Sequence, residues 1–346
     1  MKSGFVAILG RPNVGKSTIM NRLIGYKIAA VSSRAQTTRH KIQTVYTDDR
    51  GQIILLDTPG VNKAETKLGE YMLDAAVDSL KTADVIMWVI EPSTFIGKGE
   101  RLIAETIGKA AGGKSSRPVC LVINKVDTVS DNTSDILMRT KDTYSRYMKQ
   151  EYGVTFRDIY EVSAAKNTGV KELMSGLFEL LPEGPLYYDP DTLTDETERD
   201  IAAEFIREKC LMYLDKEIPH GIAVIVDSMK FRERRGATGD GPVVFGNAAE
   251  PGDDSKTLSD SSDTYDDINE NEIADIEATI ICEKESHKGI IIGKKGVMLK
   301  KIGSAARHDI EEMLGCRVNL RLWVKVRPGW RNNFGNLKEY GYSEKK

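Results

Sequence analysis

The apolar positions of the first 180 residues fall into short runs that alternate with segments of helical period. Strands are predicted at Phe5–Leu9, Lys41–Tyr46, Ile53–Leu56, Val85–Ile90, Val119–Ile123 and Ile159–Val162. Helices are predicted between them, at Thr18–Leu23, Leu68–Lys81 and Gly99–Gly108. Because the strands are mostly apolar on both faces and alternate with helices, residues 1–180 are expected to form an α/β domain with a mostly parallel sheet.

The pattern changes after residue 180. Three prolines lie within Leu181–Pro190, which excludes a continuing helix and indicates a linker over residues 181–195. Residues 196–330 are predicted as an α+β domain, with a helix at 196–217, strands at 221–226 and 274–285, a helix after Gly296 and a strand at 318–326. A tail rich in basic and aromatic residues follows at 331–346.

The net charge of -3 conceals two segments of opposite charge. Residues 236–277 contain twelve Asp and Glu residues against one Lys, whereas residues 288–346 contain fourteen Lys and Arg residues against five Asp and Glu. The acidic segment, about 233–272, is poor in apolar residues and is expected to be a disordered insertion. A regulatory role, in which it competes with RNA for the basic surface, is the alternative. The basic end favours a nucleic-acid partner.

The cysteines and the lack of long apolar segments indicate in which cellular compartment the protein is found. Cys120, Cys210, Cys282 and Cys316 have no paired spacing, so neither a disulfide framework nor a zinc site is expected. No apolar stretch approaches about 20 residues, and nothing resembles a cleavable signal. We therefore expect a soluble cytoplasmic protein. We also expect it to be a monomer.

A glycine-rich loop joins the first strand to the first helix. Its spacing, Gly-x4-Gly-Lys-Ser, lets backbone N–H groups turn onto phosphate oxygens, while a lysine supplies positive charge and a hydroxyl reaches Mg²⁺. The helix that follows adds its positive dipole end. A nucleoside triphosphate is the expected ligand, bound by Gly10, Asn13, Val14, Gly15, Lys16, Ser17 and Thr18.

Two further segments are expected to face the outer phosphates. Residues 25–39 are predicted as an exposed loop, in which Thr38 completes the Mg²⁺ shell opposite Ser17 and His40 is a solvated residue. Ordinary surface threonines are the alternative. Asp57 ends a buried strand and is placed to meet Mg²⁺ through water. The backbone N–H of Gly60 approaches the third phosphate, in the sequence Asp57-Thr58-Pro59-Gly60.

The residues after the next strands indicate which base is bound. A carboxylate at Asp127 accepts hydrogen bonds from two guanine N–H donors, a pattern that adenine lacks. Lys125 is expected to lie over the base and Asn124 to tie this loop to the phosphate loop. Ser163 and Ala164 follow the strand at 159–162, where a backbone N–H meets the guanine carbonyl. The order of these four loops predicts GTP and GDP as ligands.

The second domain carries a glycine-lysine turn, Gly293-Lys294-Lys295-Gly296, predicted between a strand and an amphipathic helix. Glycines allow the turn to press its backbone against one nucleic-acid strand, and the lysines meet phosphates. In the last strand, alternate residues from Val318 to Val326 are expected to face inward. The RNA-facing residues predicted beyond the turn are Arg321, Trp323, Lys325, Arg327, Trp330 and Arg331. A surface turn beside a solvated charged strand is the alternative.

Together these motifs resemble the Era family of translation-factor-related GTPases, over nearly the whole chain apart from the acidic insertion. The resemblance implies a GTPase domain followed by a type II K-homology (KH) domain. It implies catalysis by Lys16, Thr38 and Gly60, with slow intrinsic hydrolysis because Val61 replaces a water-orienting glutamine. It also implies a K⁺ ion at Asn13. The expected partners are the 3′ end of small-subunit (16S) ribosomal RNA and the 30S subunit, in assembly and rRNA maturation.

Two other functions stay open at this point. A GTPase acting on transfer RNA is one, although no cysteine, metal or cofactor motif accompanies the phosphate loop. A regulatory GTPase at the membrane surface is the other, with the basic tail on anionic lipid at the inner face of the cell membrane. The glycine-lysine turn and the alternating strand favour RNA over lipid.

Overall fold

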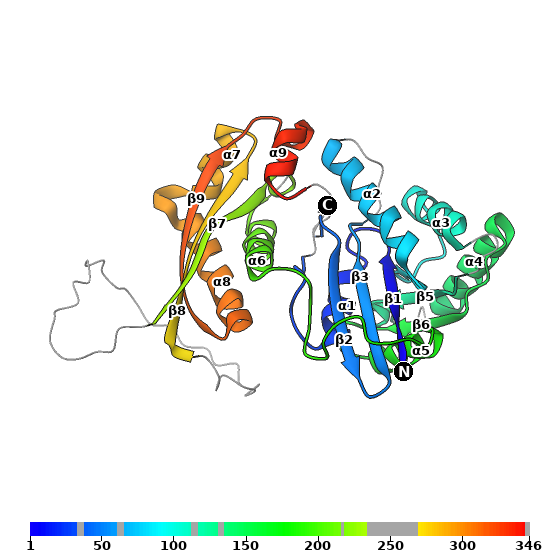
Figure 1. Ribbon diagram of the computed structural model, residues 1–346. Helices are drawn as coiled ribbons and strands as arrows, with labels where there is room; N and C mark the ends of the chain where they lie inside the picture. The colour runs from blue at the N-terminus through cyan, green and yellow to red at the C-terminus, as the bar shows by residue number, and fades with distance from the viewer. Residues whose placement is uncertain are drawn as a thin grey trace.

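The computed structural model describes residues 1–32, 38–60, 66–111, 117–130, 135–215, 218–233 and 269–342 (Figure 1). In the described residues the N-terminal unit contains a six-stranded sheet of order β2-β3-β1-β4-β5-β6, in which only the β2–β3 pair is antiparallel. The strands are β1 (Lys2–Leu9), β2 (Ile42–Asp48), β3 (Gly51–Asp57), β4 (Val85–Ile90), β5 (Val119–Asn124) and β6 (Asp158–Val162).

Helices cover both faces of this sheet because its central strands are buried throughout. On one face lie α1 (Lys16–Ile24) and α5 (Val170–Leu180), packed against Val6 and Ile8. On the other lie α2 (Lys67–Thr82), α3 (Lys98–Ala111) and α4 (Asp135–Tyr152), packed against Ala7 and Leu9. The α/β class is therefore confirmed. Helices α4 and α5 were not predicted; α4 buries only Thr140, Tyr144 and Met148, so its apolar period is weak.

The C-terminal unit places two helices on one face of a three-stranded sheet. Its strands are β7 (Ala223–Glu233), β8 (Asn269–Cys282) and β9 (Cys316–Val326), with β7 antiparallel and β9 parallel to β8. Helices α6 (Glu198–Tyr213) and α8 (Val297–Leu314) cover the inner face, as expected for an α+β domain. The remaining elements are α7 (Glu285–Ile292), α9 (Phe334–Glu339) and the 3₁₀ turns η1 (Val126–Thr128), η3 (Pro219–Gly221), η4 (Lys294–Gly296) and η5 (Trp330–Asn332).

Two predictions about this unit need correction. The acidic insertion predicted at 233–272 is shorter than expected, because the paired strands on either side reach into it: β7 continues to Glu233 and β8 begins at Asn269. The residues between these strands, 234–268, lie outside the described ones. The segment before the glycine-lysine turn is the helix α7 and not a strand. A run of three isoleucines has no period of its own, and in α7 Ile291 is buried while Ile290 is 50% exposed.

Residues 181–195, predicted as a linker, follow the edge of the six-stranded sheet. Ser3 N donates to Pro182 O at 3.0 Å, and Val45 N donates to Leu193 O at 2.8 Å. The Gln52 side chain accepts hydrogen bonds from the backbone N–H groups of Tyr187 and Tyr188 at 2.8 and 3.0 Å. This segment is therefore held against the N-terminal unit along much of its length.

The two units contact each other directly. In Figure 1 helix α6 lies between the two sheets, and α9 lies near one end of α2. An apolar cluster joins them and consists of Leu68 and Met72 from α2 with Ala223, Ile281, Trp330, Leu337, Tyr340 and Tyr342. The contact positions the C-terminal segment beside the loop that follows α1.

Candidate functional site

The phosphate loop is shaped by glycines that have no room for a side chain. Gly15 immediately precedes α1 with φ of 93°, and a Cβ there would lie 2.2 Å from Asn124 Nδ2. A Cβ on Gly10 would lie 2.5 Å from Val89 O. Lys16 is 6% exposed, and its Nζ donates to the carbonyls of Gly10 and Arg11, both at 3.1 Å. Burial lowers the Lys16 pKa to about 8, although the Asp57 charge opposes this shift.

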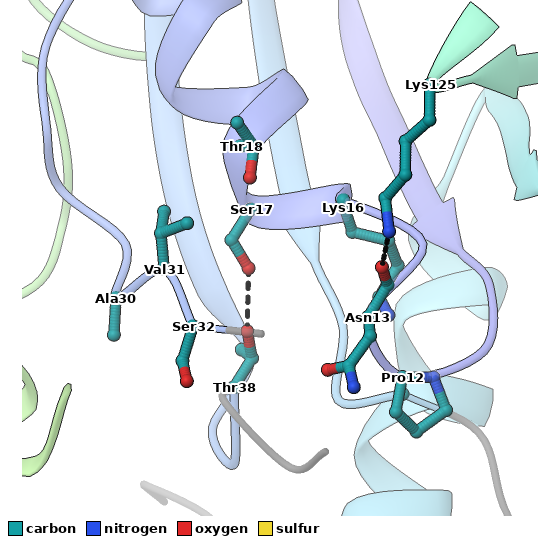
Figure 2. Close-up of a pocket in the computed structure, with 12 residues that line it drawn as sticks. Pro12, Asn13, Lys16, Ser17, Thr18, Ala30, Val31, Ser32, Thr38 and Lys125 are labelled. Atoms are coloured by element: carbon teal, nitrogen blue, oxygen red, sulfur yellow. Dashed lines mark hydrogen bonds between the residues drawn. The ribbon is translucent and has the colours of Figure 1, made fainter. Parts of the chain in front are cut away.

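Three oxygen-bearing side chains converge beside the loop. Ser17 Oγ lies 2.9 Å from Thr38 Oγ1 (Figure 2). Asp57 Oδ2 lies 2.7 Å from Ser17 Oγ and 3.0 Å from Thr38 Oγ1. Asp57 is fully buried, and its Oδ1 has no hydrogen-bond partner among the described residues. Burial raises the pKa of this carboxyl group, against the effects of the Lys16 charge and the two hydroxyls. Two hydroxyls and a buried carboxylate with a free oxygen fit Mg²⁺, which prefers oxygen ligands.

A cavity of about 220 Å³ opens beside these groups. Figure 2 shows its lining of Pro12, Asn13, Gly15, Lys16, Ser17, Thr18, Ala30, Val31, Ser32, Thr38, Gly60 and Lys125. A Cβ on Gly60 would lie 2.8 Å from Pro12 N, so only glycine lets this backbone come so close. Two predicted residues face elsewhere: the Thr58 hydroxyl donates to Ile8 O at 2.6 Å, and the Val14 side chain packs in the core.

The predicted base-binding loops come together at one end of the sheet. Asn124 Nδ2 donates to Val14 O at 2.8 Å, and Ala164 N donates to Asn124 Oδ1 at 3.1 Å. The exposed Asp127 accepts a hydrogen bond from Ser163 Oγ at 2.5 Å, which lowers the pKa of this carboxyl group. An ionised Asp127 is suited to accept hydrogen bonds from guanine.

Lys125 has a second partner that the sequence did not reveal. Its backbone is left-handed, with φ of 63°, and its Nζ donates to Asn13 O at 2.7 Å (Figure 2). The same ammonium pairs with Glu91, the residue after β4. Asn124 and Lys125 therefore both tie the base-binding loop to the phosphate loop. The only signal for Glu91 was its place at the carboxyl end of a strand.

The loop after α1 is not the exposed segment that was predicted. Ile28, Ala29, Ala30, Thr38 and Arg39 are at most 6% exposed, and residues 33–37 lie outside the described ones. His40 is not a solvated residue either, because its ring stacks on Tyr342 with centroids 4.5 Å apart. The prediction failed because the polar composition of the loop did not reveal that the C-terminal unit packs over it. Val61, predicted to slow hydrolysis, lies outside the described residues.

The glycine-lysine turn lies between α7 and α8. Gly293 has φ of 72° and Gly296 φ of 79°, while Lys294 and Lys295 are exposed. Gly296 precedes the first residue of α8, so the positive end of that helix dipole lies at the turn. Ile290 and Val297, which flank the turn, are 50% and 67% exposed; the sequence reasoning missed this apolar pair.

Strand β9 alternates as predicted. Val318 is buried, and Leu320, Leu322, Val324 and Val326 pack against the same core. The residues of the opposite face that were predicted to meet RNA, namely Arg321, Trp323, Lys325 and Arg327, are exposed. Arg321 lies 3.5 Å from Glu277, a partly exposed pair.

Trp330 is the exception among the predicted RNA contacts. Its side chain is fully buried, its Nε1 donates to Gly221 O at 3.0 Å, and its ring packs on Tyr340 and Tyr342. A buried indole has no face available for stacking on a base, so this prediction is corrected. Arg331, the next residue, is 30% exposed and pairs with Glu283 at 2.6 Å.

The fold and these two sites define a phosphate-loop GTPase that carries a KH domain. The profile of the family described as 50S ribosome-binding GTPase matches residues 5–125, and the KH domain profile matches residues 262–331. GTPase Era of Ruminiclostridium cellulolyticum is 43% identical over 345 residues, which cover 100% of this chain and 99% of that protein. GTPase Era of Clostridioides difficile is 42% identical over 346 residues and 99% of both chains. The chain belongs to the Era GTPase family.

Two solved structures are similar over the same length. One is the crystal structure of an Aquifex aeolicus Era variant bound to GDP and aluminium fluoride. The other is of Era in complex with MgGDPNP and nucleotides 1506–1542 of 16S ribosomal RNA. Each has a TM-score of 0.80 and 33% identity, covering 99% of this chain and 100% of the other. Among the described residues of the present chain, no helix has the length and apolar character needed to cross a membrane.

Proposed function

We propose that this GTPase binds single-stranded RNA at the 3′ end of 16S ribosomal RNA and acts in small-subunit assembly and rRNA maturation. The observation that carries the proposal is the exposed glycine-lysine turn at the start of α8, in the same chain as a site suited to GTP. A similar structure that contains both MgGDPNP and this RNA supports it. The RNA contacts we assign are Gly293, Lys294, Lys295, Gly296, Arg321, Trp323, Lys325, Arg327 and Arg331.

The division of the chain that goes with this function is also a proposal. Residues 1–180 form the GTPase domain, residues 181–195 connect the domains, and residues 196–330 form the KH domain, followed by a tail at 331–346. The two sheets and their separate sets of helices support this division. We further propose that the protein acts as a cytoplasmic monomer, and that any contact of its basic tail with anionic lipid is peripheral.

We assign the nucleotide contacts residue by residue. Lys16 meets the outer phosphates together with the backbone N–H groups of the phosphate loop and of Gly60. Ser17 and Thr38 would hold Mg²⁺ directly and Asp57 would hold it through water, and the bound ion would neutralise phosphate charge during hydrolysis. Asn124, Lys125, Asp127, Ser163 and Ala164 surround the guanine.

Hydrolysis follows from these contacts. A water oxygen attacks the γ-phosphorus while the bond between this phosphorus and the β,γ-bridging oxygen breaks. The bridging oxygen leaves with GDP, and phosphate is the other product. Thr38 and the backbone near Gly60 hold the water and the γ-phosphate in line. We propose a slow intrinsic rate, because Val61 has no side-chain group that orients water by hydrogen bonding.

Asn13 is the proposed K⁺ contact. It lines the phosphate cavity in a left-handed conformation, with φ of 68°, and its carbonyl already accepts the Lys125 ammonium. Hydrolysis is expected to be faster in potassium than in sodium buffer at equal ionic strength. Equal rates in the two buffers would remove K⁺ from the assignment.

RNA crosslinking and sequencing from cells tests the main proposal. The intact protein is compared with the double variant Lys294→Asp and Lys295→Asp. Lys149 and Lys171, exposed on α4 and α5 of the GTPase domain, provide a control with the same change of charge. Reads at the 3′ end of 16S rRNA are expected with the intact protein and the control, and their loss is expected in the Lys294 and Lys295 variant. Reads on transfer RNA, or none above background, would overturn the proposal.

A further inference from the structure

Arg39 joins the GTP site to the C-terminal domain. It follows Thr38, whose hydroxyl lies between Ser17 and Asp57, and its own side chain is fully buried. The guanidinium donates from Nη2 to His220 O at 2.9 Å and from Nη1 to Ile222 O at 2.5 Å. It also lies 5.9 Å from the centre of the Trp330 ring. All three of these partners belong to the C-terminal domain.

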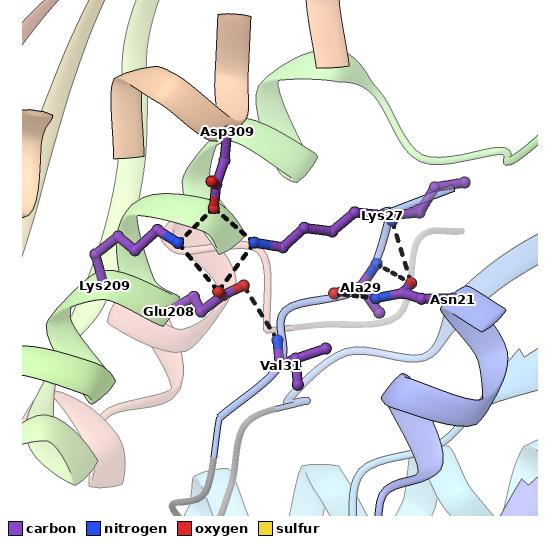
Figure 3. A network of polar contacts seen from close by, with 8 residues as sticks. Asn21, Lys27, Ala29, Val31, Glu208, Lys209 and Asp309 are labelled. Carbon is purple, nitrogen blue, oxygen red and sulfur yellow. Dashed lines mark hydrogen bonds and ion pairs between the residues drawn. The ribbon is translucent and has the colours of Figure 1, made fainter. Parts of the chain in front are cut away.

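The beginning of the same loop is held by that domain as well (Figure 3). Lys27 Nζ lies 3.0 Å from Glu208 and 2.6 Å from Asp309, and Val31 N donates to Glu208 Oε2 at 3.1 Å. Lys209 joins the two carboxylates from within the C-terminal domain. Asp309 lies on α8, the helix that begins at the glycine-lysine turn. Both described ends of the loop are therefore anchored on the C-terminal domain.

These anchors restrict where Thr38 can lie. Arg39 Nε has no hydrogen-bond partner among the described residues, so the buried guanidinium is bonded through its two Nη groups alone. Losing either of these bonds would leave a further buried donor unpaired, so Arg39 is held where the two carbonyls are. Consecutive Cα atoms are about 3.8 Å apart, so Thr38 cannot move far while Arg39 stays in place. The anchored position is the one in which the Thr38 hydroxyl contacts Ser17 and Asp57.

We propose that Arg39 is a positioning residue for GTP hydrolysis, through which the C-terminal domain holds Thr38 in the Mg²⁺ site of the same chain. This inference rests on the proposed role of Thr38. Arg39 is not among the residues that line the phosphate cavity, and it acts by fixing its neighbour. Movement of the C-terminal domain then changes the hydrolysis rate without any change in the phosphate loop.

Steady-state hydrolysis by the full chain tests the proposal with Arg39→Met, which keeps an unbranched chain that can pack in a buried site but removes all the donors of the guanidinium. We expect kcat to fall about 10- to 100-fold, as for a small misplacement of a reacting group. GDP has no third phosphate for Thr38 to meet, so GDP affinity is expected to stay within about twofold of wild type. Arg39→Lys, which can reach only one carbonyl at a time, should restore part of kcat.

Arg50→Met, at a side chain that is 43% exposed, is the control for removing an arginine outside the domain contact. Arg50 also donates hydrogen bonds and lies over an aromatic ring, Phe178 at 4.1 Å, but all its partners are in the N-terminal unit. This variant is expected to keep wild-type kcat. If it loses kcat as Arg39→Met does, the effect is a general loss of stability and the proposal fails.

Thr38→Ala separates this inference from the function it rests on. If Thr38→Ala keeps wild-type kcat, the role of Thr38 fails and the inference fails with it. If Thr38→Ala lowers kcat but Arg39→Met does not, only the inference is overturned. Arg39→Met added to Thr38→Ala should cause no further loss; an additive loss would show that Arg39 acts elsewhere.

Thermal melting shows whether Arg39→Met folds. If it does not fold, two milder variants, Trp330→Phe and Arg39→Lys, test the proposal. Trp330→Phe keeps an aromatic ring but removes the indole N–H that bonds Gly221 O, between the two carbonyl groups that hold Arg39. A reduced kcat with unchanged GDP affinity is expected for this variant and for Arg39→Lys. Wild-type kcat in both would overturn the proposal.

Discussion

At the scale of single residues, the nucleotide site depends on side chains that are themselves oriented by a partner. Asp127 shows this most directly, because Ser163 Oγ donates to one of its oxygens and lowers the pKa of the carboxyl group. Lys125 is similarly held by Asn13 O and Glu91. Each of these partners comes from a different loop, so the base site and the phosphate site are built as one unit.

Asp127→Asn is expected to shift the base preference from guanine toward xanthine. The amide replaces an acceptor with a donor, which suits the carbonyl that xanthine has in place of the guanine amine. Loss of a hydrogen bond to a charged group costs about 1.5–3 kcal/mol, so GTP should bind about 10- to 100-fold more weakly. Competition binding with GTP and XTP measures the shift. Asp142→Asn, at an exposed position on α4, is the control. An unaltered guanine preference would refute the role of Asp127.

At the scale of elements, the glycine-lysine turn combines two glycines with different structural demands. Gly293 has φ of 72° and ψ of 173°, a region that other residues rarely enter, and a Cβ there would lie 2.8 Å from the Met298 Cβ. Gly296 has φ of 79° and ψ of 9°, and a Cβ there would meet no atom within 4 Å. Gly293 is therefore required both by its backbone conformation and by the lack of room for a side chain. Gly296 is required by its backbone conformation alone.

Gly293→Ala is therefore expected to destabilise the protein more than Gly296→Ala. In Gly293→Ala, the strained backbone costs about 1–3 kcal/mol. The close contact between the new Cβ and Met298 adds to this cost. The left-handed conformation in Gly296→Ala costs about 1–2 kcal/mol. Urea unfolding of the two variants compares the free energies. Equal losses, or a larger loss at Gly296, would contradict the geometry of the turn.

At the scale of the whole molecule, charged side chains connect the two domains. Burial raises the pKa of Asp309, but the hydrogen bonds from Lys209 and Lys27 together outweigh it, and the pKa lies below its usual value. Lys27 comes from the N-terminal unit, whereas Lys209 and Asp309 lie on α6 and α8. The ionised carboxylate is thus a condition for the domain contact.

The contact is expected to weaken in acid. A carboxyl group whose pKa is lowered by folding stabilises the folded state above its unfolded pKa of about 3.9, and this contribution is lost as pH falls through the folded value. Asp309→Asn should lower the free energy of unfolding near pH 6 by about 1–3 kcal/mol and show a smaller further loss below pH 4. Urea unfolding between pH 6 and pH 3 measures both. Coincident curves for the variant and the wild type would show that Asp309 does not contribute, and a constant offset between them would contradict the loss of its contribution in acid.

Much of the nucleotide site was predictable because its geometry is local. A glycine pattern, a lysine and a hydroxyl within nine consecutive residues specify the phosphate loop, and parallel strands bring their carboxyl ends to the same edge. Asp57 and Asn124 are the last residues of buried strands, and Asp127 lies in the turn after β5, so their convergence was a consequence of the sheet. The inward face of β9 was also predictable from a local pattern, because its apolar residues recur at every second position.

What the sequence by itself determined was therefore the set of loops, their order and the chemistry each can perform. The tertiary structure alone decided which of the remaining polar and aromatic residues are buried. Trp330 is buried in an apolar cluster that Leu68 and Met72 of the other domain complete. Arg39 is buried where His220 and Ile222, some 180 residues away, offer their carbonyls. Burial of this kind depends on how two domains pack, a relation between distant segments that no local pattern of residues encodes.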